Sequence, residues 1–347
     1  MHSNQFNTSE SKTILVTGAA GFIGCHLSKK LLDQGHQVIG LDNINGYYSV
    51  QLKLDRLKQL GVDEVAEGEL VSSATYSNQF QFIKIDLENR NELNSLFNRF
   101  KFDVVCNLAA QAGVRYSIDN PNVYVDTNVV GFMNLLECVR HSDVKKLIFA
   151  SSSSVYGNNK NTPFKTTDQV DHPVSLYAAT KKSNELMAYT YSYLYNIQTI
   201  GLRFFTVYGP WGRPDMAMFL FTDAILNNKP IKVFNHGNLS RDFTYIDDIV
   251  NGVEKTLLQE QPDQKNYSLY NIGNGSPVQL MDFIKAIEKS TAKIAQKEML
   301  PMQPGDVVKT WADTTNLERD YNYTPNTSIR EGVDNFVAWY KDYHKIK

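Results

Sequence analysis

Short apolar runs alternate with longer amphipathic segments through the first 200 residues of the chain. The apolar runs are rich in Val, Ile and Leu and lack polar alternation, which is typical of strands buried on both faces. These runs are "TILVTG", "HQVIGLD", "FQFIKIDL", "DVVCNLAA" and "KKLIFASS". Helix-length segments such as 22–34 and 121–141 lie between them. This order predicts an α/β fold on a doubly wound parallel sheet, which binds ligands at the carboxyl ends of its strands.

The alternation is interrupted once and then changes character. The polar interval 61–79 breaks the rhythm, and we expect it to be an excursion on the surface. Beyond about residue 209 the pattern is mixed, with "IKVF" and "YNI" extended and three segments helical, 213–226, 246–258 and 328–343. We therefore expect a flexible N-terminus over 1–11, a sheet domain over 12–208 and a smaller mixed substrate lobe over 209–347, with some lobe segments returning to the sheet.

Composition and charge narrow the classes of function. The 347 residues are 42% hydrophobic and 21% charged, enough for a substantial core. A formal net charge of -2 provides no field that would gather a phosphate polymer, so no nucleic-acid partner is expected. The polar opening lacks the apolar core of a signal peptide, and no stretch reaches the ~18 apolar residues of a membrane span. We expect a cytoplasmic protein with no membrane partner.

The three cysteines give no sign of a disulfide framework or a metal site. Cys25, Cys106 and Cys138 lie far apart in apolar or helical surroundings, and none is part of a CxxC pair. Disulfide-rich and zinc-binding chains show closer and more regular spacings. No metal is therefore expected.

The strongest local signal is "TGAAGFIG", which follows the first predicted strand and begins a helix. Gly18, Gly21 and Gly24 suit a tight turn, a close approach of pyrophosphate to the backbone, and close packing of helix on strand. The amino end of the helix would then face the phosphates. A glycine trio alone is also compatible with a merely structural turn, so the interpretation depends on what accompanies it.

An acid and small residues accompany the glycines at the ends of the next strands. Asp42 ends the second strand, 18 residues after Gly24, where a carboxylate can accept hydrogen bonds from an adenosine ribose and would repel a 2'-phosphate. NAD is therefore favoured over NADP, and the sheet domain is expected to be a Rossmann domain. Asp86 is expected at the adenine, although a helix cap would also explain it. Five apolar residues complete the expected cofactor-binding set: Phe22, Ile23, Leu87, Ala109 and Ala110.

The spacing YxxxK occurs three times, so spacing alone identifies nothing. Tyr156 and Lys160 flank a turn-like "GNN", and Tyr343 with Lys347 ends the chain. Tyr177 and Lys181 begin a convincing helix, in which residues four apart share a face. Because a free tyrosine has a pKa of about 10, we expect the nearby ammonium to lower it until the phenol can act as a base.

At this point the chain resembles the extended short-chain dehydrogenase/reductases, and among them the nucleotide-sugar epimerases. The resemblance covers nearly the whole chain and depends on motifs in the family order: "TGAAGFIG", "SSSSVYG", "YAATK", "LRFFTVYGP", "RDFTYIDD" and "QPGD". Three longer stretches, "QAGVRYS", "GPWGRPDMA" and "MQPGDVVKTWAD", are similar to those of UDP-glucuronate 4-epimerases. The resemblance implies NAD-dependent epimerisation at C4 of UDP-glucuronate to UDP-galacturonate through a transient 4-keto sugar, and a homodimer.

The resemblance also implies roles for individual residues. Ser152 would bond the reacting hydroxyl, Tyr177 would take its proton, and Lys181 would hold the nicotinamide ribose. Arg241 would bind the diphosphate, and Asp306 would meet the uridine ribose. Phe234 and Val278 would sandwich the uracil, with Val233 beside them. Many relatives carry Arg where this chain has Gln303, which removes one expected cation.

The serines before "VYG" distinguish epimerisation from the other reactions that could follow oxidation of the sugar. Related dehydratases and decarboxylases resemble this chain but carry acids at or near the positions of Ser153 and Ser154. A hydroxyl cannot do the general acid or base work that those second steps need. Epimerisation needs only the return of hydride to the opposite face. A polar strand end capped by its own hydroxyls is the alternative reading of these serines.

The sequence indicates candidates for the sugar pocket and for the contact between subunits. Arg213 and Arg115 are both candidates for the glucuronate carboxylate, because arginine suits a planar anion. Thr206 stands where galactose epimerases carry Asn, which suggests a remodelled pocket. The predicted helix over 177–195 carries more apolar and aromatic residues than one core face can use, which favours a dimer.

Three other functions remain open from the sequence. One is a 4-epimerase of UDP-glucose or a UDP-N-acetylhexosamine, and another is a UDP-glucuronate decarboxylase or a dehydratase. The third is a non-catalytic scaffold that senses NAD. The missing acids count against the second, and the presence of both Tyr177 and Lys181 counts against the third.

Overall fold

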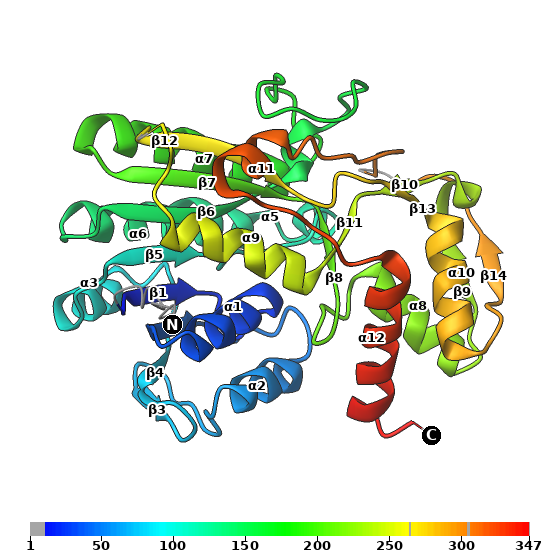
Figure 1. Cartoon of the computed structure of the whole chain (residues 1–347), viewed down its shortest axis with the longest axis horizontal. Coiled ribbons are helices and arrows are strands. Elements are labelled where there is room, and N and C mark those ends of the chain that lie inside the picture. Colours follow the sequence, from blue (N-terminus) through cyan, green and yellow to red (C-terminus); the bar gives the residue numbers. More distant parts are fainter. Residues whose placement is uncertain (1–10, 264, 304–305, 347) are drawn as a thin grey trace, which may run out of the picture.

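The computed structural model describes residues 11–263, 265–303 and 306–346 and centres on an eight-stranded sheet (Figure 1). The strand order is β12-β7-β6-β5-β1-β2-β4-β3, and every neighbouring pair is parallel except β3 with β4. The eight strands are β1 (Thr13–Thr17), β2 (Gln37–Asp42), β3 (Leu70–Ser73), β4 (Ser77–Lys84), β5 (Val104–Asn107), β6 (Lys146–Ser152), β7 (Gln198–Phe204) and β12 (Tyr267–Ile272). The order reverses between β1 and β5, which confirms the predicted doubly wound α/β fold.

Helices cover both faces of this sheet. On one face α1 packs against α9, and on the other α6 packs against α3 and α7 (Figure 1). The central strands β1, β2, β5, β6 and β7 are therefore buried, as their apolar sequences predict. These helices are α1 (Phe22–Asp33), α3 (Arg90–Arg99), α6 (Phe132–Arg140), α7 (Leu176–Tyr195) and α9 (Ile246–Leu258).

The expected helix over 121–141 is made of consecutive pieces. It begins with α5 (Pro121–Tyr124), continues as a π-helical segment over Val125–Gly131, and ends with α6. A Cβ on Gly131 would lie 2.8 Å from Cβ of Leu87, so the helix approaches the end of β4 closely. The short α4 (Tyr116–Asp119) precedes these pieces, and α2 (Val50–Gln59) follows β2.

The expectation for 61–79 is wrong in part. Residues 70–73 form β3, which pairs antiparallel with β4 at the edge of the sheet rather than lying free on the surface. The strand, LVSS, is short and half exposed, and only its first two residues are apolar, so it forms no apolar run of strand length. Of the expected N-terminal segment, residues 1–10 lie outside the described residues.

The chain after residue 209 builds a mixed lobe and also returns to the sheet. α9 covers the sheet and β12 pairs with β7, whereas the lobe holds three helices and short strand pairs. The pairs are β8 (Thr206–Tyr208) with β11 (Phe243–Tyr245), β9 (Ile231–Val233) with β14 (Lys297–Met299), and β10 (Ser240–Arg241) with β13 (Val278–Gln279). The helices are α8 (Ala217–Leu226), α10 (Leu280–Thr291) and α12 (Ile329–Tyr343), and α11 (Thr315–Tyr321) lies beside β12.

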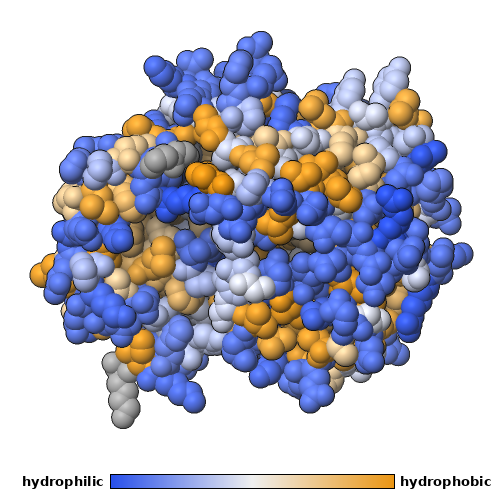
Figure 2. Space-filling model, turned by 180° about the vertical axis from the view of Figure 1, so that it is seen from behind, coloured by the Kyte–Doolittle hydropathy of each residue, from blue (hydrophilic) through white to orange (hydrophobic). Residues whose placement is uncertain are grey.

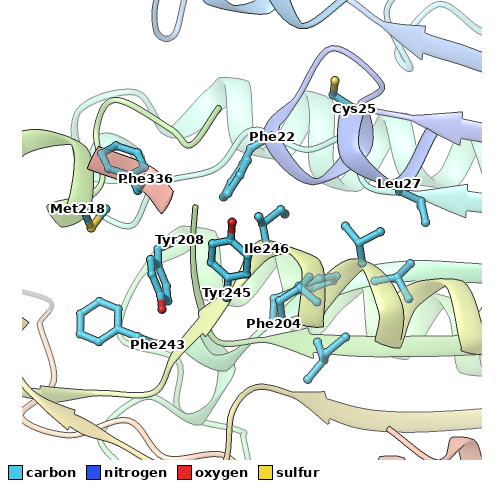
Figure 3. Close-up of a cluster of buried hydrophobic side chains, with 14 of the residues drawn as sticks. Phe22, Cys25, Leu27, Phe204, Tyr208, Met218, Phe243, Tyr245, Ile246 and Phe336 are labelled. Carbon is cyan, nitrogen blue, oxygen red and sulfur yellow. The ribbon is translucent and has the colours of Figure 1, made fainter. Parts of the chain in front are cut away.

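One buried cluster joins the sheet to the lobe (Figure 3). Phe22 of α1 and Phe204 of β7 belong to the same cluster as Phe243 and Phe336 of the lobe. The rings of Phe243 and Phe283 stack with centroids 4.0 Å apart. This shared core fixes the lobe against the carboxyl ends of the strands, and the cavity described below lies there. No helix among the described residues is long and apolar enough to cross a membrane.

Candidate active site

A cavity of about 1040 Å³ runs from the carboxyl ends of the strands into the lobe. Its wall includes the ends of β2, β6 and β7, the segment that follows β5, and residues of α8. A pocket for one drug-sized ligand occupies roughly 300–1,000 Å³, so this cavity lies at the upper end of that range. We call the part around Gly18, Gly21, Gly24 and Asp42 the glycine end. The part around Arg115, Arg213 and Arg241 is the arginine end.

The backbone forms the glycine end. Gly18 has a φ of +74°, and a Cβ there would lie 2.8 Å from the backbone N of Ala109. A Cβ on Gly24 would collide with the carbonyl oxygen of Gly18, so only glycine lets α1 begin this close to β1. Gly21 is the N-cap of α1 and has no side chain to occupy the first N–H groups of the helix. These groups face the cavity, where a phosphate would be stabilised.

Asp42 ends β2 on the cavity wall and is nearly buried. Its carboxylate accepts hydrogen bonds from the backbone N of Ala20 at 3.2 Å and of Ile44 at 2.8 Å. Burial raises the pKa of Asp42, while the charge of Lys53 and these two hydrogen bonds oppose the rise. Lys53 also lines the cavity and donates to the carbonyl oxygen of Asn45 at 2.8 Å. Sequence reasoning missed Lys53, because nothing in the pattern of α2 marks an inward lysine.

Most of the expected cofactor residues line the glycine end, and one does not. Phe22, Ile23, Leu87, Ala109 and Ala110 all contribute to the cavity wall. Asp86 lies off the wall, where its carboxylate accepts a hydrogen bond from Nδ2 of Asn43 at 2.5 Å. Asn43 lines the cavity in its place.

The serine, tyrosine and lysine lie together between the two ends. Ser152 is the last residue of β6, and Tyr177 and Lys181 lie on the first turns of α7, all on the cavity wall. The α7 helix begins here because the side chain of Ser175 accepts a hydrogen bond from the backbone N of Ala178 at 3.1 Å. Lys181 is 2% exposed and donates to the carbonyl oxygen of Ala150 at 2.9 Å.

The expected lowering of the tyrosine pKa by Lys181 is wrong for this structure. Burial raises the pKa of Tyr177, and the groups that oppose the rise are the Ser152 hydroxyl and the charge of Arg213. The reason lies in the surroundings of Lys181, since burial lowers its own pKa to about 8 and its ammonium is bonded to a backbone carbonyl. The sequence showed the shared helical face but could not show this burial.

Of the other two YxxxK pairs, the described residues Tyr156, Lys160 and Tyr343 do not lie on the cavity wall. The hydroxyl of Tyr156 donates to Oδ1 of Asn271 at 2.6 Å inside the protein. Tyr343 donates to Oδ2 of Asp55 at 2.7 Å, and Lys347 lies outside the described residues. The choice of Tyr177 over these two is therefore consistent with the geometry.

The serines after Ser152 turn along the cavity wall. Ser153 and Ser154 begin a 3₁₀ turn over Ser153–Tyr156, and both line the cavity. The hydroxyl of Ser152 accepts from the backbone N of Ser154 and donates to its hydroxyl oxygen, each at 3.1 Å. The capping that sequence reasoning left as an alternative is thus present, and the same hydroxyls also face the cavity.

Two arginines at the arginine end are already paired with acids. Arg213 donates from Nε to Oδ1 of Asp215 at 3.0 Å and from Nη2 to Oδ2. Arg115 reaches Oδ2 of Asp306 at 3.1 Å and lies over the Phe234 ring, 5.6 Å from its centroid. The sequence could not show either pair, because Arg115 and Asp306 are 191 residues apart and the RxD spacing of the other pair carries no geometry.

The remaining expected substrate residues divide into two groups. Thr206, Phe234 and Arg241 line the cavity, as does Gln303. The Arg241 guanidinium donates from Nη1 to the carbonyl oxygens of Ser240 and Val308, and burial lowers its pKa. Val233 and Val278 lie off the wall, Val233 fully buried in β9 and Val278 paired with Arg241 between β13 and β10.

The chain is similar to known proteins over nearly its whole length. A family model described as GDP-mannose 4,6 dehydratase matches residues 15–336. The Protein CapI of Staphylococcus aureus is 54% identical over 96% of this chain and 99% of its own length. A probable UDP-glucuronate 4-epimerase of Rhizobium meliloti is 44% identical over 95% of this chain and 97% of its own.

The fold likeness extends to a solved structure. The crystal structure of a UDP-glucuronic acid 4-epimerase from Bacillus cereus, in complex with UDP-glucuronic acid and NAD, superposes with a TM-score of 0.85 at 34% identity. The match covers 95% of this chain and 99% of the Bacillus chain. Because the family model spans most of the chain and these relatives match it almost end to end, the chain belongs to the GDP-mannose 4,6 dehydratase family.

Proposed function

We propose that this protein epimerises UDP-glucuronate at C4, giving UDP-galacturonate, with NAD as a cofactor that is regenerated in each turnover. The observation that carries the proposal is the cavity wall on which Ser152 and Tyr177 lie with Ser153 and Ser154, hydroxyls in the place of the acids of related dehydratases and decarboxylases. The relatives named UDP-glucuronate 4-epimerases, and the Bacillus enzyme bound to UDP-glucuronic acid and NAD, support the same substrate and cofactor.

The glycine end fits a dinucleotide. At Gly18 and Gly24 the backbone segments are too close together for a Cβ. The start of α1 has no side-chain cap, so its N–H groups can bind a pyrophosphate. Asp42 would meet the adenosine ribose, and Leu87, Ala109 and Ala110 would provide apolar walls. When bound, NAD supplies the hydride acceptor and donor for the sugar carbon. Asp86 would not contact the adenine itself. It would act through Asn43, which donates a hydrogen bond to its carboxylate.

The chain's own residues move the proton. Tyr177 would remove the proton from the C4 hydroxyl and return it after the keto sugar has turned, while Ser152 holds that oxygen. Burial raises the pKa of Tyr177, and the Ser152 hydroxyl and the charge of Arg213 oppose the rise, so these two groups would favour the phenolate that accepts the proton. Lys181 would hold the nicotinamide ribose. A hydroxyl at positions 153 and 154 offers no second base at C5, so the ketone is reduced again rather than consumed.

The arginine end would hold the rest of the substrate. Arg241 would bind the diphosphate, Asp306 the uridine ribose and Phe234 the uracil. Arg213 would meet the sugar carboxylate together with Thr206, Ser153 and Ser154, and Arg115 is the second candidate for that contact. The wall position of Phe234 makes it a better uracil contact than Val278, which lies off the wall.

Incubation of the purified protein with UDP-glucuronate, followed by ¹H NMR, tests the proposal. The expected product is UDP-galacturonate at an equilibrium ratio, without added NAD being consumed. UDP-xylose would identify a decarboxylase, and turnover of UDP-glucose but not UDP-glucuronate would identify the other epimerase. No change with any of these substrates would favour a non-catalytic role.

The exposed face of α7 supports a further proposal, that two chains associate. Leu186, Tyr189 and Tyr193 are 57%, 54% and 78% exposed, whereas Met187 and Tyr191 pack against the core beneath α7. Apolar residues gather in patches on the face seen from behind (Figure 2). Light scattering at micromolar concentration is expected to give the mass of a dimer. A monomer would leave α7 with an exposed face that has no explanation.

A further inference from the structure

The arginine end contains a chain of three side chains that reaches across the cavity. Arg213 and Asp215 come from the segment after β8, and Tyr47 comes from the loop between β2 and α2. The Tyr47 hydroxyl donates to Oδ2 of Asp215 at 3.1 Å, and Asp215 accepts two hydrogen bonds from Arg213. All three line the cavity. The orientation of Arg213 therefore depends on a residue 166 positions earlier in the chain.

Tyr47 lies in a space that is open only because residue 113 is a glycine. Gly113 has a φ of +107°, and a Cβ on it would collide with the Tyr47 hydroxyl. The Tyr47 ring packs on the ring of Tyr116 with centroids 4.8 Å apart, and the Arg213 guanidinium lies 5.8 Å from the Tyr47 centroid. The segment from Gly113 to Tyr116, which follows β5, thus holds the tyrosine where it can orient an acid of the lobe.

The protonation states suit this arrangement near neutral pH. Burial raises the pKa of Tyr47 to about 12, and the charge of Asp215 acts in the same direction. The phenol therefore stays protonated and can donate a hydrogen bond. Burial alone would raise the pKa of Asp215. The charge of Arg213 and the hydrogen bonds to Asp215 outweigh this effect, so the pKa lies below the ordinary value. Asp215 is therefore ionised while it is held.

Asp215 contacts one edge of the guanidinium only. Among the residues that the structure describes, the hydrogen bonds from Arg213 run from Nε and Nη2. The Nη1 end remains for a second planar anion, and an arginine can hold two carboxylates on different edges because it has five N–H donors. Since Asp215 already offsets the charge of Arg213, its effect on a second anion would be one of direction more than of attraction.

We propose that Asp215, itself held by Tyr47, is a positioning residue that fixes Arg213 so that its free edge orients the carboxylate of the sugar. The proposal depends on the function proposed above. In that reaction the 4-keto intermediate is a β-keto acid, which loses CO₂ when its carboxylate bond stands perpendicular to the ketone. A guanidinium held at one angle keeps the carboxylate out of that alignment, whereas a mobile one does not.

The test uses Asp215→Asn, Asp215→Ala and Tyr47→Phe, assayed with UDP-glucuronate for turnover and for the fraction of decarboxylated product. We expect roughly a tenfold rise in that fraction for Asp215→Ala, because charge-assisted hydrogen bonds are lost. For Tyr47→Phe we expect about two- to tenfold, as for a neutral hydrogen bond. KM should change less than the product ratio in both variants.

The chain offers a matched control on its surface. Tyr76 donates to Oδ1 of Asp33 at 2.9 Å, and Lys29 donates to Oδ2 of the same carboxylate at 2.7 Å, the same kind of triad away from the cavity. Tyr76→Phe and Asp33→Asn are expected to leave turnover and product ratio unchanged. Circular dichroism of each variant establishes that it folds, and the isosteric Asp215→Asn keeps the test valid if Asp215→Ala does not fold.

Calorimetric binding separates failure of this proposal from failure of the proposed function. The wild type should bind UDP-glucuronate more tightly than UDP-glucose, and Asp215→Ala should keep that preference and the affinity for UDP, because the charge of Arg213 is still present and is no longer offset. If the wild type epimerises UDP-glucuronate and all three variants give its product ratio, the positioning role of Asp215 is overturned. If the wild type shows neither turnover of UDP-glucuronate nor a preference for the carboxylated sugar, the proposed substrate fails and this role fails with it.

Discussion

The glycine end and the arginine end of the cavity are built in different ways. At the glycine end the shape comes from the backbone, since Gly18 and Gly24 bring β1 and α1 closer together than a Cβ would allow. At the arginine end the wall consists of long charged side chains from separate loops, and two of its arginines are paired with Asp215 and Asp306. The glycine end is already formed without a ligand. At the arginine end, Arg115 and Arg213 must either leave their acidic partners or bind a ligand beside them.

This difference separates what a substitution can change. Under the proposed function, crowding the backbone at the glycine end would remove the cofactor site, while a substitution at the arginine end would change which sugar is held and at what angle. Ser152, Tyr177 and Lys181 lie between the two ends, and in the proposed reaction they would act on the groups held at both. A substitution between the ends should therefore remove chemistry while both kinds of binding remain.

The largest effect is expected for Tyr177→Phe. The change removes the proton acceptor but little surface, so turnover of UDP-glucuronate should fall by about 10²- to 10⁴-fold while NAD remains bound. Single-turnover kinetics and absorbance of bound cofactor measure the two properties. Tyr343→Phe, at another YxxxK pair whose hydroxyl contacts Asp55, is the control and should keep wild-type turnover. Activity of Tyr177→Phe within a few-fold of wild type would refute the assignment.

The next effect is expected for Gly24→Ala at the glycine end. The added Cβ meets the carbonyl oxygen of Gly18, which is backbone and cannot move aside cheaply. Overpacking of this kind costs roughly 1–3 kcal/mol, and we expect the upper part of that range together with loss of bound NAD. Urea denaturation and cofactor content measure these effects. Gly46→Ala, where a Cβ meets nothing within 4 Å, should change stability by less than about 1 kcal/mol.

A smaller effect is expected for Arg213→Ala at the arginine end. A charge-assisted contact contributes roughly 1.5–3 kcal/mol, which corresponds to one to two orders of magnitude in a branching ratio. The variant should epimerise UDP-glucuronate slowly and release more CO₂, while its affinity for UDP changes little. Arg330→Ala, an exposed arginine on α12, is the control. If UDP affinity falls as far as turnover and no extra CO₂ appears, Arg213 binds the diphosphate and Arg115 becomes the carboxylate candidate.

The same contrast explains how much the sequence could predict. The sheet, its strand order reversal and the glycine end follow from apolar runs and from glycines within eight residues of one another, which are local patterns with one structural solution. The short edge strand β3 was missed, because its sequence LVSS contains only two adjacent apolar residues. Asp86 was placed by its position after β4, which fixes the backbone but leaves the side chain free to bond Asn43 instead.

At the arginine end the residue types were predictable and their partners were not. Arg115, Arg213 and Asp306 were named from motifs, yet the pairs that they form join segments far apart in the chain or follow from loop geometry. Tyr47 had no signal of its own, and only the space at Gly113 and the contact with Asp215 show why it lies there. Contacts between loops depend on the whole fold, so they are the last part of a site that a sequence reveals.

The smallest expected effect concerns Lys181, between the two ends. Burial lowers its pKa from 10.5 to about 8, so between these values the unfolded chain binds more protons at this residue than the folded protein does. Stability then rises with pH, by about 1 kcal/mol from pH 8 to pH 9 for one such group. Lys146 has a similar shift, but it is present in both proteins when the wild type is compared with Lys181→Met, and its contribution cancels. In cofactor-free protein, urea denaturation should therefore show the wild type gaining stability relative to Lys181→Met over that interval. A relative loss would mean that the fold favours the charged lysine before the cofactor binds, and that this part of the cavity resembles the paired arginine end more than the preformed glycine end.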